Sequence, residues 1–410
     1  MNLIIILTII FCSGYFLSIT TLGSTMTIMA MAVCSLVIIL EGVLQRKRKL
    51  QGGLLIGRKT FYLTAYLIAI VLFSSGLSSI VGKQVILYFC AMLIVSVCDW
   101  NDFKKEYIRV MVVISCFALI GYALQYTPVI NMLPTMVNYN GTVYVNGILF
   151  SFIKYTYSGL TERLHGLFWE PGLFATYLAI AIAFLKKENT KNYWITLGLF
   201  TVCLIMTKSG AGIAMMPLIL IIKLTDRKDE ELSLRRNVLL CGVLILIFII
   251  GQIGSDVIDQ WLNDYLLVKL NDTSNVSNFM RTNAVLVDLQ IAWNHFPFGI
   301  GIAQYAPEVA KFNSTLQSSG TSTITTYLAE YGVLGIPVVL IWIKALFQIA
   351  DSRKFVTRLA TLLMFLTILT KEPHGNLLFM NCILLYSTVG YRSENDLINI
   401  NMEENKNVCI

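Results

Sequence analysis

Charged residues are scarce in this sequence: Asp, Glu, Lys and Arg make up only 13% of its 410 residues. Apolar residues make up 56%, and the mean hydropathy is +0.70. Soluble domains typically carry about 25% charged residues. The composition therefore excludes a soluble globular protein of this length, and it predicts an all-α polytopic membrane protein that forms a single integral membrane domain over residues 1–410.

Hydrophobic runs of nearly membrane-spanning length recur along the whole chain. A transmembrane helix needs about 20 mainly apolar residues, and about twelve runs come close to that length. The first run has no basic residues before it and the second follows it closely, so we expect a retained helix and not a cleaved signal. The predicted spans are 3–20, 24–40, 61–80, 84–98, 108–126, 169–185, 193–207, 210–225, 237–254, 323–343, 355–370 and 376–391.

The few basic residues are unevenly distributed between the two sets of alternate loops. One set, together with the tails, carries 23 of the 31 Lys and Arg residues, and the opposite set carries eight. Basic residues accumulate on the cytoplasmic side, so both termini are expected inside the cell. The net charge of +7 then reflects topology and not nucleic-acid binding. The basic run 46–49 is open to a second reading, as a contact for lipid headgroups.

Two of the predicted outer loops are long, at 127–169 and 255–322, whereas most inner loops are short connectors. Long loops usually carry a function. We therefore expect any chemistry on the outer face, in loops that contain short helices.

Cysteine is missing from these long outer loops. All nine cysteines fall in predicted helices, at their inner ends or in the inner tail, which excludes a disulfide framework or a cysteine-based metal site in the loops. Asp-x-Asp pairs are also missing there. The sequence therefore makes no case for a metal or another cofactor.

The densest group of ionisable residues is the segment 163–172, RLHGLFWEPG, which leads into an apolar helix. It contains Arg163, His165 and Glu170. Pro171 is favoured in the first turn of a helix, which places Glu170 at the helix cap. The positive end of the helix dipole should favour the ionised carboxylate, as a general base or a cation-pairing group requires. The alternative is that Glu170 only caps the helix and pairs with Arg163.

Three further groups lie on the predicted outer side. Glu330 lies about seven residues into a predicted span, where a carboxylate needs a wet cavity or a partner, unless the helix begins one turn later. Lys208 occupies a short turn of small residues, which could bind an anion or simply anchor the helix ends. His374 lies in a similar short turn, KEPHG.

The segment 281–295 reads as a short helix within the second long loop, with Arg281 at one end and His295 at the other. Val285, Leu289, Ala292 and Trp293 give it a mixed apolar face. We expect a helix on the membrane surface, with Arg281 and His295 free to face a ligand. Simple packing that holds the loop is the alternative.

Together these motifs resemble the O-antigen ligase/polymerase superfamily, and most closely its Wzy-type polysaccharide polymerases. The resemblance is carried by RLHGLFWEPG, the TKSG helix hairpin, Arg281 before the FPFGIG turn, and LAEYGVLG in a late helix. It covers about residues 163–337 by motif and the whole chain by hydropathy. It implies a GT-C-like membrane fold with an outward-facing active site.

The resemblance also implies an activity. Such an enzyme joins oligosaccharide repeat units carried on undecaprenyl diphosphate into O-antigen, capsular or exopolysaccharide, at the outer face of the bacterial cytoplasmic membrane. That chemistry needs cations for the departing diphosphate, a base for the attacking hydroxyl and a groove for lipid. A chain-length regulator and a flippase are possible partners. Family members are regarded as metal-independent.

Roles follow for individual residues. Arg binds phosphate oxygens in pairs and keeps its charge, so Arg163 and Arg281 are expected to bind the diphosphate, with Lys208 assisting. The substrate-binding candidates are Arg163, His165, Lys208, Arg281 and His295. Glu170 ranks first as catalytic base, before Glu330 and His374.

The sequence departs from the family at two points, and two alternatives stay open. Ligases of the superfamily usually carry a His about nine residues before the late Glu, where this chain has Thr321 and Ser322; this favours a polymerase over an O-antigen ligase. The usual Ser-Arg-Gly is Lys-Ser-Gly here. A lipid-linked oligosaccharide flippase also has about twelve helices, but related halves and charged mid-helix positions, typical of transporters, are not evident.

Overall fold

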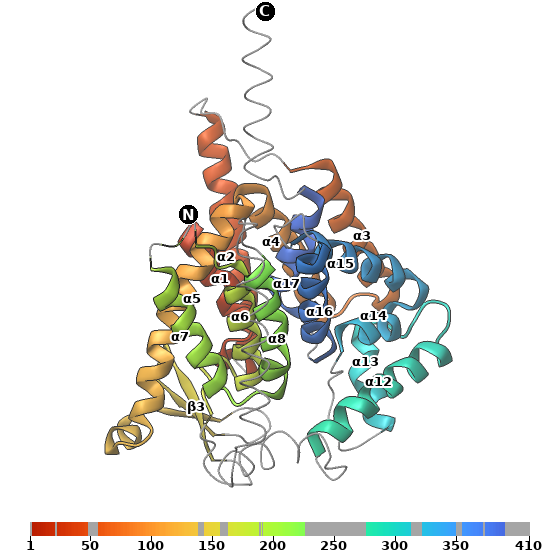
Figure 1. The fold of residues 1–410 in the computed structure, drawn as a ribbon. Helices are drawn as coiled ribbons and strands as arrows, with labels where there is room; N and C mark the ends of the chain where they lie inside the picture. The colour runs from red at the N-terminus through yellow and green to blue at the C-terminus, as the bar shows by residue number, and fades with distance from the viewer. Residues whose placement is uncertain are drawn as a thin grey trace, which may run out of the picture.

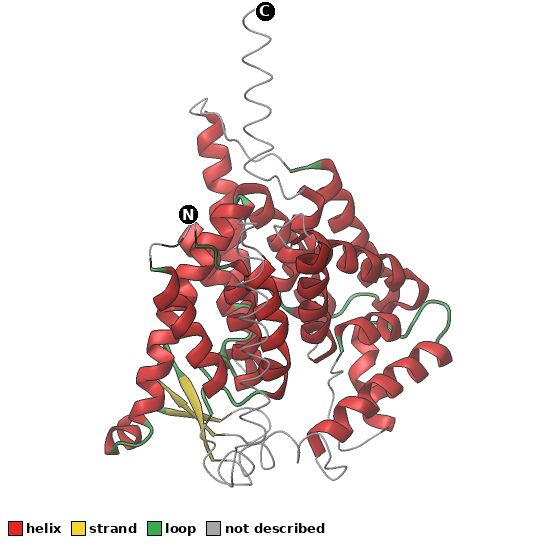
Figure 2. Ribbon diagram, in the orientation of Figure 1, coloured by secondary structure: helices red, strands yellow, loops and turns green. Residues whose placement is uncertain are grey.

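The computed structural model is a bundle of α-helices with one small sheet (Figure 1; Figure 2). It describes residues 2–20, 23–47, 56–137, 143–155, 163–187, 190, 192–225, 276–312, 322–349, 355–371 and 374–389. Its α-helices are α1 (Asn2–Phe11), α2 (Gly23–Lys47), α3 (Arg58–Ser75), α4 (Ser79–Val97), α5 (Trp100–Leu124), α6 (Pro171–Phe184), α7 (Tyr193–Met206), α8 (Gly210–Thr225), α12 (Val276–Asn294), α13 (Ile302–Phe312), α14 (Thr323–Tyr331), α15 (Gly335–Ile349), α16 (Phe355–Lys371) and α17 (Leu378–Val389). Short 3-10 helices are η1 (Phe16–Ile19), η2 (Pro128–Met132), η5 (Gly332–Leu334) and η6 (His374–Asn376).

The helices support a membrane protein. Within the described residues, four are long and apolar enough to cross a bilayer: Gly23–Leu44, Ser79–Val97, Trp100–Leu124 and Thr323–Ile349. Six shorter apolar helices, of 10–17 residues, are α1, α6, α7, α8, α16 without its last residue, and α17. The predicted span 237–254 lies outside the described residues.

Two predicted spans are interrupted in their interior, and a third, 61–80, extends past the end of α3 at Ser75 into the first residues of α4. In the span 3–20, α1 ends at Phe11 and η1 follows after a turn at Gly14, whose φ is +119°. In the span 323–343, α14 ends at Tyr331 and α15 starts at Gly335, with Gly332 between them at φ +56°. Positive φ is a conformation that glycine adopts at little cost and other residues rarely adopt. Both interruptions therefore depend on a glycine.

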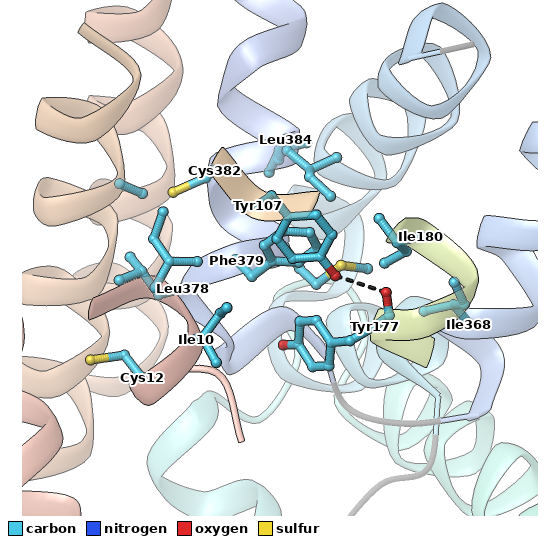
Figure 3. Close-up of a cluster of buried hydrophobic side chains, with 14 of the residues drawn as sticks. Ile10, Cys12, Tyr107, Tyr177, Ile180, Ile368, Leu378, Phe379, Cys382 and Leu384 are labelled. Atoms are coloured by element: carbon cyan, nitrogen blue, oxygen red, sulfur yellow. Dashed lines mark hydrogen bonds between the residues drawn. The ribbon is translucent and has the colours of Figure 1, made fainter. Parts of the chain in front are cut away.

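Buried aromatic and aliphatic side chains fill the centre of the bundle, where α1, α5, α6 and α17 meet (Figure 3). The ring of Tyr107 stacks on that of Phe379 at 4.9 Å between centroids, and its hydroxyl donates to the carbonyl of Tyr177 at 2.9 Å. The Tyr177 hydroxyl donates in turn to the carbonyl of Ser13 at 2.7 Å, in the turn after α1. The core thus holds the first helix interruption in place.

Contacts between helices define the two ends of the bundle. Helices α6 and α8 run parallel, as their ends show: the Lys223 ammonium near the end of α8 donates to the carbonyls of Ala183 and Leu185 at the end of α6. Helices α8 and α16 run antiparallel, because Thr357 at the start of α16 bonds Thr225 at the end of α8, at 2.7 Å. The starts of α6 and α8 and the end of α16 therefore lie at one end, called the site end below.

The opposite end, called the basic end, joins the end of α17 to α3 and α4. Thr388 bonds Thr60 at 2.7 Å, and the Tyr386 hydroxyl donates to the carbonyl of Cys98 at 2.9 Å. Basic residues from distant parts of the chain meet at this end, at the start of α3, the start of α5, the end of α8 and the start of α16; they include Arg58, Lys59, Lys104, Lys105, Lys223 and Arg358.

The first long loop, 127–169, folds differently from the expected short helices. Apart from η2, its described part forms an antiparallel sheet of β1 (Thr135–Val137), β2 (Val143–Asn146) and β3 (Ser151–Tyr155), in that order. Val145, Phe150 and Phe152 build a small core of their own beneath it with Ile130. Figure 2 shows the strands together at one end of the helices.

The second long loop, 255–322, does contain short helices in its described part. Helices α12 and α13 pack on each other and on α14. The predicted helix 281–295 corresponds to the longer α12. Leu289 and Trp293 of the predicted apolar face are 45% and 81% exposed, whereas Ala284, Asp288 and Ile291 are buried. The predicted face therefore points outward, and a different face of the helix makes the contacts.

Candidate functional site

The segment 163–172 is fixed in the site end of the bundle, and its residues 164–168 are buried. The Phe16 amide donates to the carbonyl of Leu167 at 3.1 Å, and the Trp169 amide donates to that of Gly14 at 3.2 Å. On its other side the Ser151 amide of β3 donates to the carbonyl of Gly166 at 2.6 Å. The segment thus lies between the first helix interruption and the small sheet.

Arg163 and Lys208 are neighbours, as a shared anion site would require. The Arg163 Nε donates to the carbonyl of Thr207 at 3.0 Å, and Nη2 donates to that of Lys208 at 3.3 Å. These carbonyls follow the last turn of α7, where helix carbonyls lack partners and the dipole is negative. Arg163 therefore stabilises the turn between α7 and α8 and brings its charge to Lys208.

The turn itself is tightly constrained. Lys208 has a φ of +47°, a left-handed conformation that is costly for a residue with a side chain. The Ser209 hydroxyl accepts from the amide of Gly212 at 3.4 Å, and the Ser209 carbonyl accepts from that of Ile213 at 2.9 Å. Two of the amides at the start of α8 are thus paired within the chain.

His165 is buried, with 1% of its surface exposed. The pKa of its imidazole is lowered from 6.5 to about 3, chiefly by burial and then by the positive charge of Arg163, while Glu170 and the Trp169 backbone act in the opposite direction. A histidine with this pKa is neutral at physiological pH. His165 therefore brings no positive charge to a diphosphate, and both of its ring nitrogens are buried in this structure.

Glu170 occupies the N-cap of α6 and Pro171 the first helical position, as the sequence predicts. The Glu170 side chain makes no capping hydrogen bond to the amides of α6. It is half-buried and lies close enough to His165 to raise that residue's pKa. The side-chain cap in the alternative role of Glu170 is therefore not formed, whereas its pairing with Arg163 stays a prediction.

Glu330 is 4% exposed and lies at the end of α14, one residue before the interruption. The backbone that approaches the nearby Gly332 is the turn 296–301. The Gly301 amide donates to the carbonyl of Glu330 at 2.8 Å, and the Val333 amide donates to that of Pro297 at 2.8 Å. A Cβ on Gly332 would lie 2.0 Å from the Pro297 carbonyl oxygen.

His374 meets the same helix at its other end. Its imidazole is fully buried, and its amide donates to the Thr323 hydroxyl at 2.8 Å, at the start of α14. A small cavity separates the two segments, with room for about one water molecule. Its lining residues are Thr323, Thr326, Tyr327, Glu330, Gly375 and Asn376. We call it the Glu330 cavity.

The structure adds a carboxylate that sequence reasoning did not single out. Asp288 of α12 is 1% exposed and accepts hydrogen bonds from the hydroxyls of Tyr305 (2.5 Å), Thr325 (2.6 Å) and Thr326 (3.3 Å). Burial raises the pKa of Asp288, and these hydrogen bonds counteract the rise. Asp288 thus joins α12, α13 and α14 next to the Glu330 cavity. Its spacing from Ala284 and Ile291, four and three residues away, is the signal that could have revealed it.

The two remaining candidates belong to α12 and the residues after it. Arg281 lies within α12, but its side chain is outside the described part of the structure. His295 directly follows α12 and is partly exposed; its carbonyl accepts from the amide of Gly299 at 2.9 Å, within the turn 296–301. His295 therefore belongs to the turn that contacts Glu330.

The site end thus carries two groups of candidates, one around Arg163 and Lys208 and one around the Glu330 cavity. Among the described residues, no three His, Cys, Asp or Glu side chains lie together in a way that could hold a metal ion. The seven cysteines in the described regions are free thiols. No protein-family model matches this sequence, and no curated protein matches it.

Proposed function

We propose that this protein is a membrane glycosyltransferase of the O-antigen ligase/polymerase type, which polymerises oligosaccharide repeat units carried on undecaprenyl diphosphate. The observation that carries the proposal is that the motifs on which the family resemblance rests lie at the same end of the bundle, as two pairs of contacting segments. The Arg163 segment contacts the Lys208 turn, and the turn 296–301 contacts the backbone beside Glu330.

In the proposed reaction, the growing glycan leaves its lipid diphosphate and is transferred to a sugar hydroxyl of the incoming lipid-linked unit. The new glycosidic bond forms as the anomeric carbon–diphosphate bond breaks. Arg163 and Lys208, with Arg281, stabilise the negative charge of the departing diphosphate. A carboxylate, Glu330 or Glu170, takes the proton of the attacking hydroxyl. We propose that no divalent metal or other cofactor is needed.

The proposed orientation follows from charge. Basic residues accumulate on the cytoplasmic side of membrane proteins, so the basic end would face the cytoplasm and the site end would face outward. With twelve spans, both termini would lie in the cytoplasm of a bacterial cell. A flippase would deliver the lipid-linked units to this face, and a chain-length regulator would be a second partner.

One observation favours a second candidate, a lipid-linked oligosaccharide flippase. Interrupted membrane helices with a buried polar group at the break are typical of transporters, and α14 and α15 with Glu330 match that description. The polymerase remains preferred, because four separate motifs carry the resemblance to it and the related halves typical of transporters are not evident in the sequence.

Deletion of the gene in its host tests the proposal. If the protein is a polymerase, surface glycan in the deletion strain should stop at one repeat unit, because single units still reach the outer face but are not joined. The glycan would be measured by gel electrophoresis, with the gene restored from a plasmid as control. Glycan of normal length in the deletion strain would refute the polymerase, and a complete loss of surface glycan would favour the flippase.

A further inference from the structure

An open apolar groove runs between α3 and α4 near the site end. Its volume is about 590 Å³, within the range of about 300–1,000 Å³ typical of small-molecule sites. Leu77, in the turn between the two helices, is 95% exposed at its rim. The lining residues are Leu72, Leu77, Ser78, Val81, Gly82, Val85 and Ile86.

Both walls of this groove connect to the Glu330 cavity. On the α3 side, the backbone of Ser74 contacts Gly301 so closely that a Cβ there would lie 2.3 Å from the Ser74 carbonyl oxygen. The Gly301 amide in turn donates to the carbonyl of Glu330. On the α4 side, the Gln84 amide group donates to the carbonyl of Gly375 at 3.3 Å, and Gly375 lines the cavity.

The surroundings of the groove restrict what can fill it. Helix α4 is long and apolar enough to cross a bilayer, and polar groups are costly inside the hydrocarbon region. Phe73, next to the lining residue Leu72 in the chain, packs edge to face on Phe298 of the turn 296–301 with ring centroids 5.7 Å apart, although the two residues are 67% and 53% exposed. An occupant of the groove is therefore a hydrocarbon chain whose polar end lies at the site end.

We propose that the α3–α4 groove binds the isoprenoid chain of the lipid-linked substrate and so directs its diphosphate and sugars to the Glu330 cavity. The inference rests on the proposed function for the identity of the lipid. Ordinary phospholipid chains are the alternative occupant, which the experiment below separates.

Two matched glycine substitutions test the groove. Gly82 lines it, and a Cβ on Gly82 would meet no atom within 4 Å. Gly198 of α7 is an exposed helical glycine with equally open space, far from the groove in sequence and on another helix. Gly82→Trp therefore places a large side chain in the groove from a Cβ that meets no other atom, and Gly198→Trp adds the same side chain at an equally open position elsewhere. Thermal unfolding of both variants in detergent shows whether they fold equally well.

The first readout is binding of the lipid. Full-length protein in phosphatidylglycerol–phosphatidylethanolamine vesicles is labelled with a photoreactive polyprenyl phosphate, and the labelled peptides are identified by mass spectrometry. In the wild type we expect labelling of α3 and α4. In Gly82→Trp this labelling should fall about fivefold; the expected loss of binding is modest because the surrounding lipid chains are as apolar as the groove. It should be unchanged in Gly198→Trp and displaced by unlabelled polyprenyl phosphate. Equal labelling in both variants, or equal displacement by added phosphatidylglycerol, would overturn the inference.

The second readout is turnover of a lipid-linked repeat unit with a long or a two-unit isoprenoid chain. Gly82→Trp should raise KM about fivefold for the long-chain substrate and leave the short-chain substrate unaffected. An equal loss for both chain lengths would contradict the inference. If the wild type forms no polymer from either substrate while groove labelling behaves as expected, the proposed polymerase fails and the lipid site stands.

Discussion

Arg163 shows how one side chain can serve both the fold and the site. The sequence identified it as a cation near a helix start, which is a local property. Its actual contacts, the carbonyls of Thr207 and Lys208, lie more than forty residues away and belong to another helix pair. Hydrogen bonds of this range depend on how the helices pack, so the sequence could place Arg163 before a helix start but could not identify its partners.

Replacing Arg163 tests both roles together. Arg163→Ala leaves two carbonyls without their donor, which should cost about 1–3 kcal/mol of stability, and it removes a charge that the proposed reaction needs. Glycan elongation should be lost even at temperatures where the variant is folded. Thermal unfolding in detergent and gel analysis of the glycan measure the two effects.

Arg109→Ala is the matched control, because Arg109 is exposed on α5 and pairs only locally with Glu106 among the described residues. It should change neither stability nor elongation. Near-normal glycan with Arg163→Ala would mean that Arg163 serves the turn alone.

The lowered pKa of buried His165 predicts that the free energy of unfolding depends on pH. Its pKa is about 3 in the folded protein, against 6.5 ordinarily, so the unfolded chain binds the proton more tightly. The stability that neutral His165 provides is complete above pH 6.5 and is lost as the pH falls toward 3. At pH 4.5 the loss should reach roughly 2–3 kcal/mol.

Thermal unfolding of the wild type and His165→Gln at pH 7.5 and pH 4.5 measures this effect. The wild type should lose more stability on acidification than the variant does, because glutamine binds no proton in this range. An equal loss in both proteins would show that His165 is accessible to protons in the folded state.

Element boundaries were predictable where they depend on local rules, and the interruptions were not. Pro171 after Glu170 marks the start of α6, and the predicted span 210–225 coincides with α8. The break after Tyr331 arises because the turn 296–301 bonds to the backbone on both sides of Gly332. That turn is more than thirty residues away, so hydrophobic periodicity alone reads one continuous helix.

Gly332 should therefore tolerate no side chain. Gly332→Ala adds a Cβ at a positive φ and against the Pro297 carbonyl, and should cost about 1–3 kcal/mol or more. Thermal unfolding in detergent measures the loss. Gly198→Ala, in open space on α7, should be neutral or slightly stabilising, since alanine favours helix. A Gly332→Ala variant as stable as Gly198→Ala would contradict the described contact between the turn and the break.

At the scale of the whole molecule, a group of basic residues that includes Arg58, Lys104 and Lys223 lies at one end of the bundle, and the candidate site residues lie at the other. Described basic residues of the predicted inner loops lie together at one end, because successive helices reverse direction. The motifs that resemble the polymerase family meet at the other end. Their assembly into an Arg163 group and a Glu330 group, with Asp288 between α12 and α14, depends on tertiary packing that sequence patterns do not encode.

The most direct measurement is polymer formation by the purified full-length protein in vesicles, supplied with lipid-linked repeat units and a metal chelator. If the protein is a polymerase, glycan of many repeats should form. Glu330→Gln should slow the rate of polymer formation about 10²–10⁴-fold if Glu330 is the base. Glu308→Gln should leave the rate unchanged, because the Glu308 carboxylate pairs with Lys311 on α13. The absence of any chain longer than one repeat, with chelator or with divalent metal, would contradict the account.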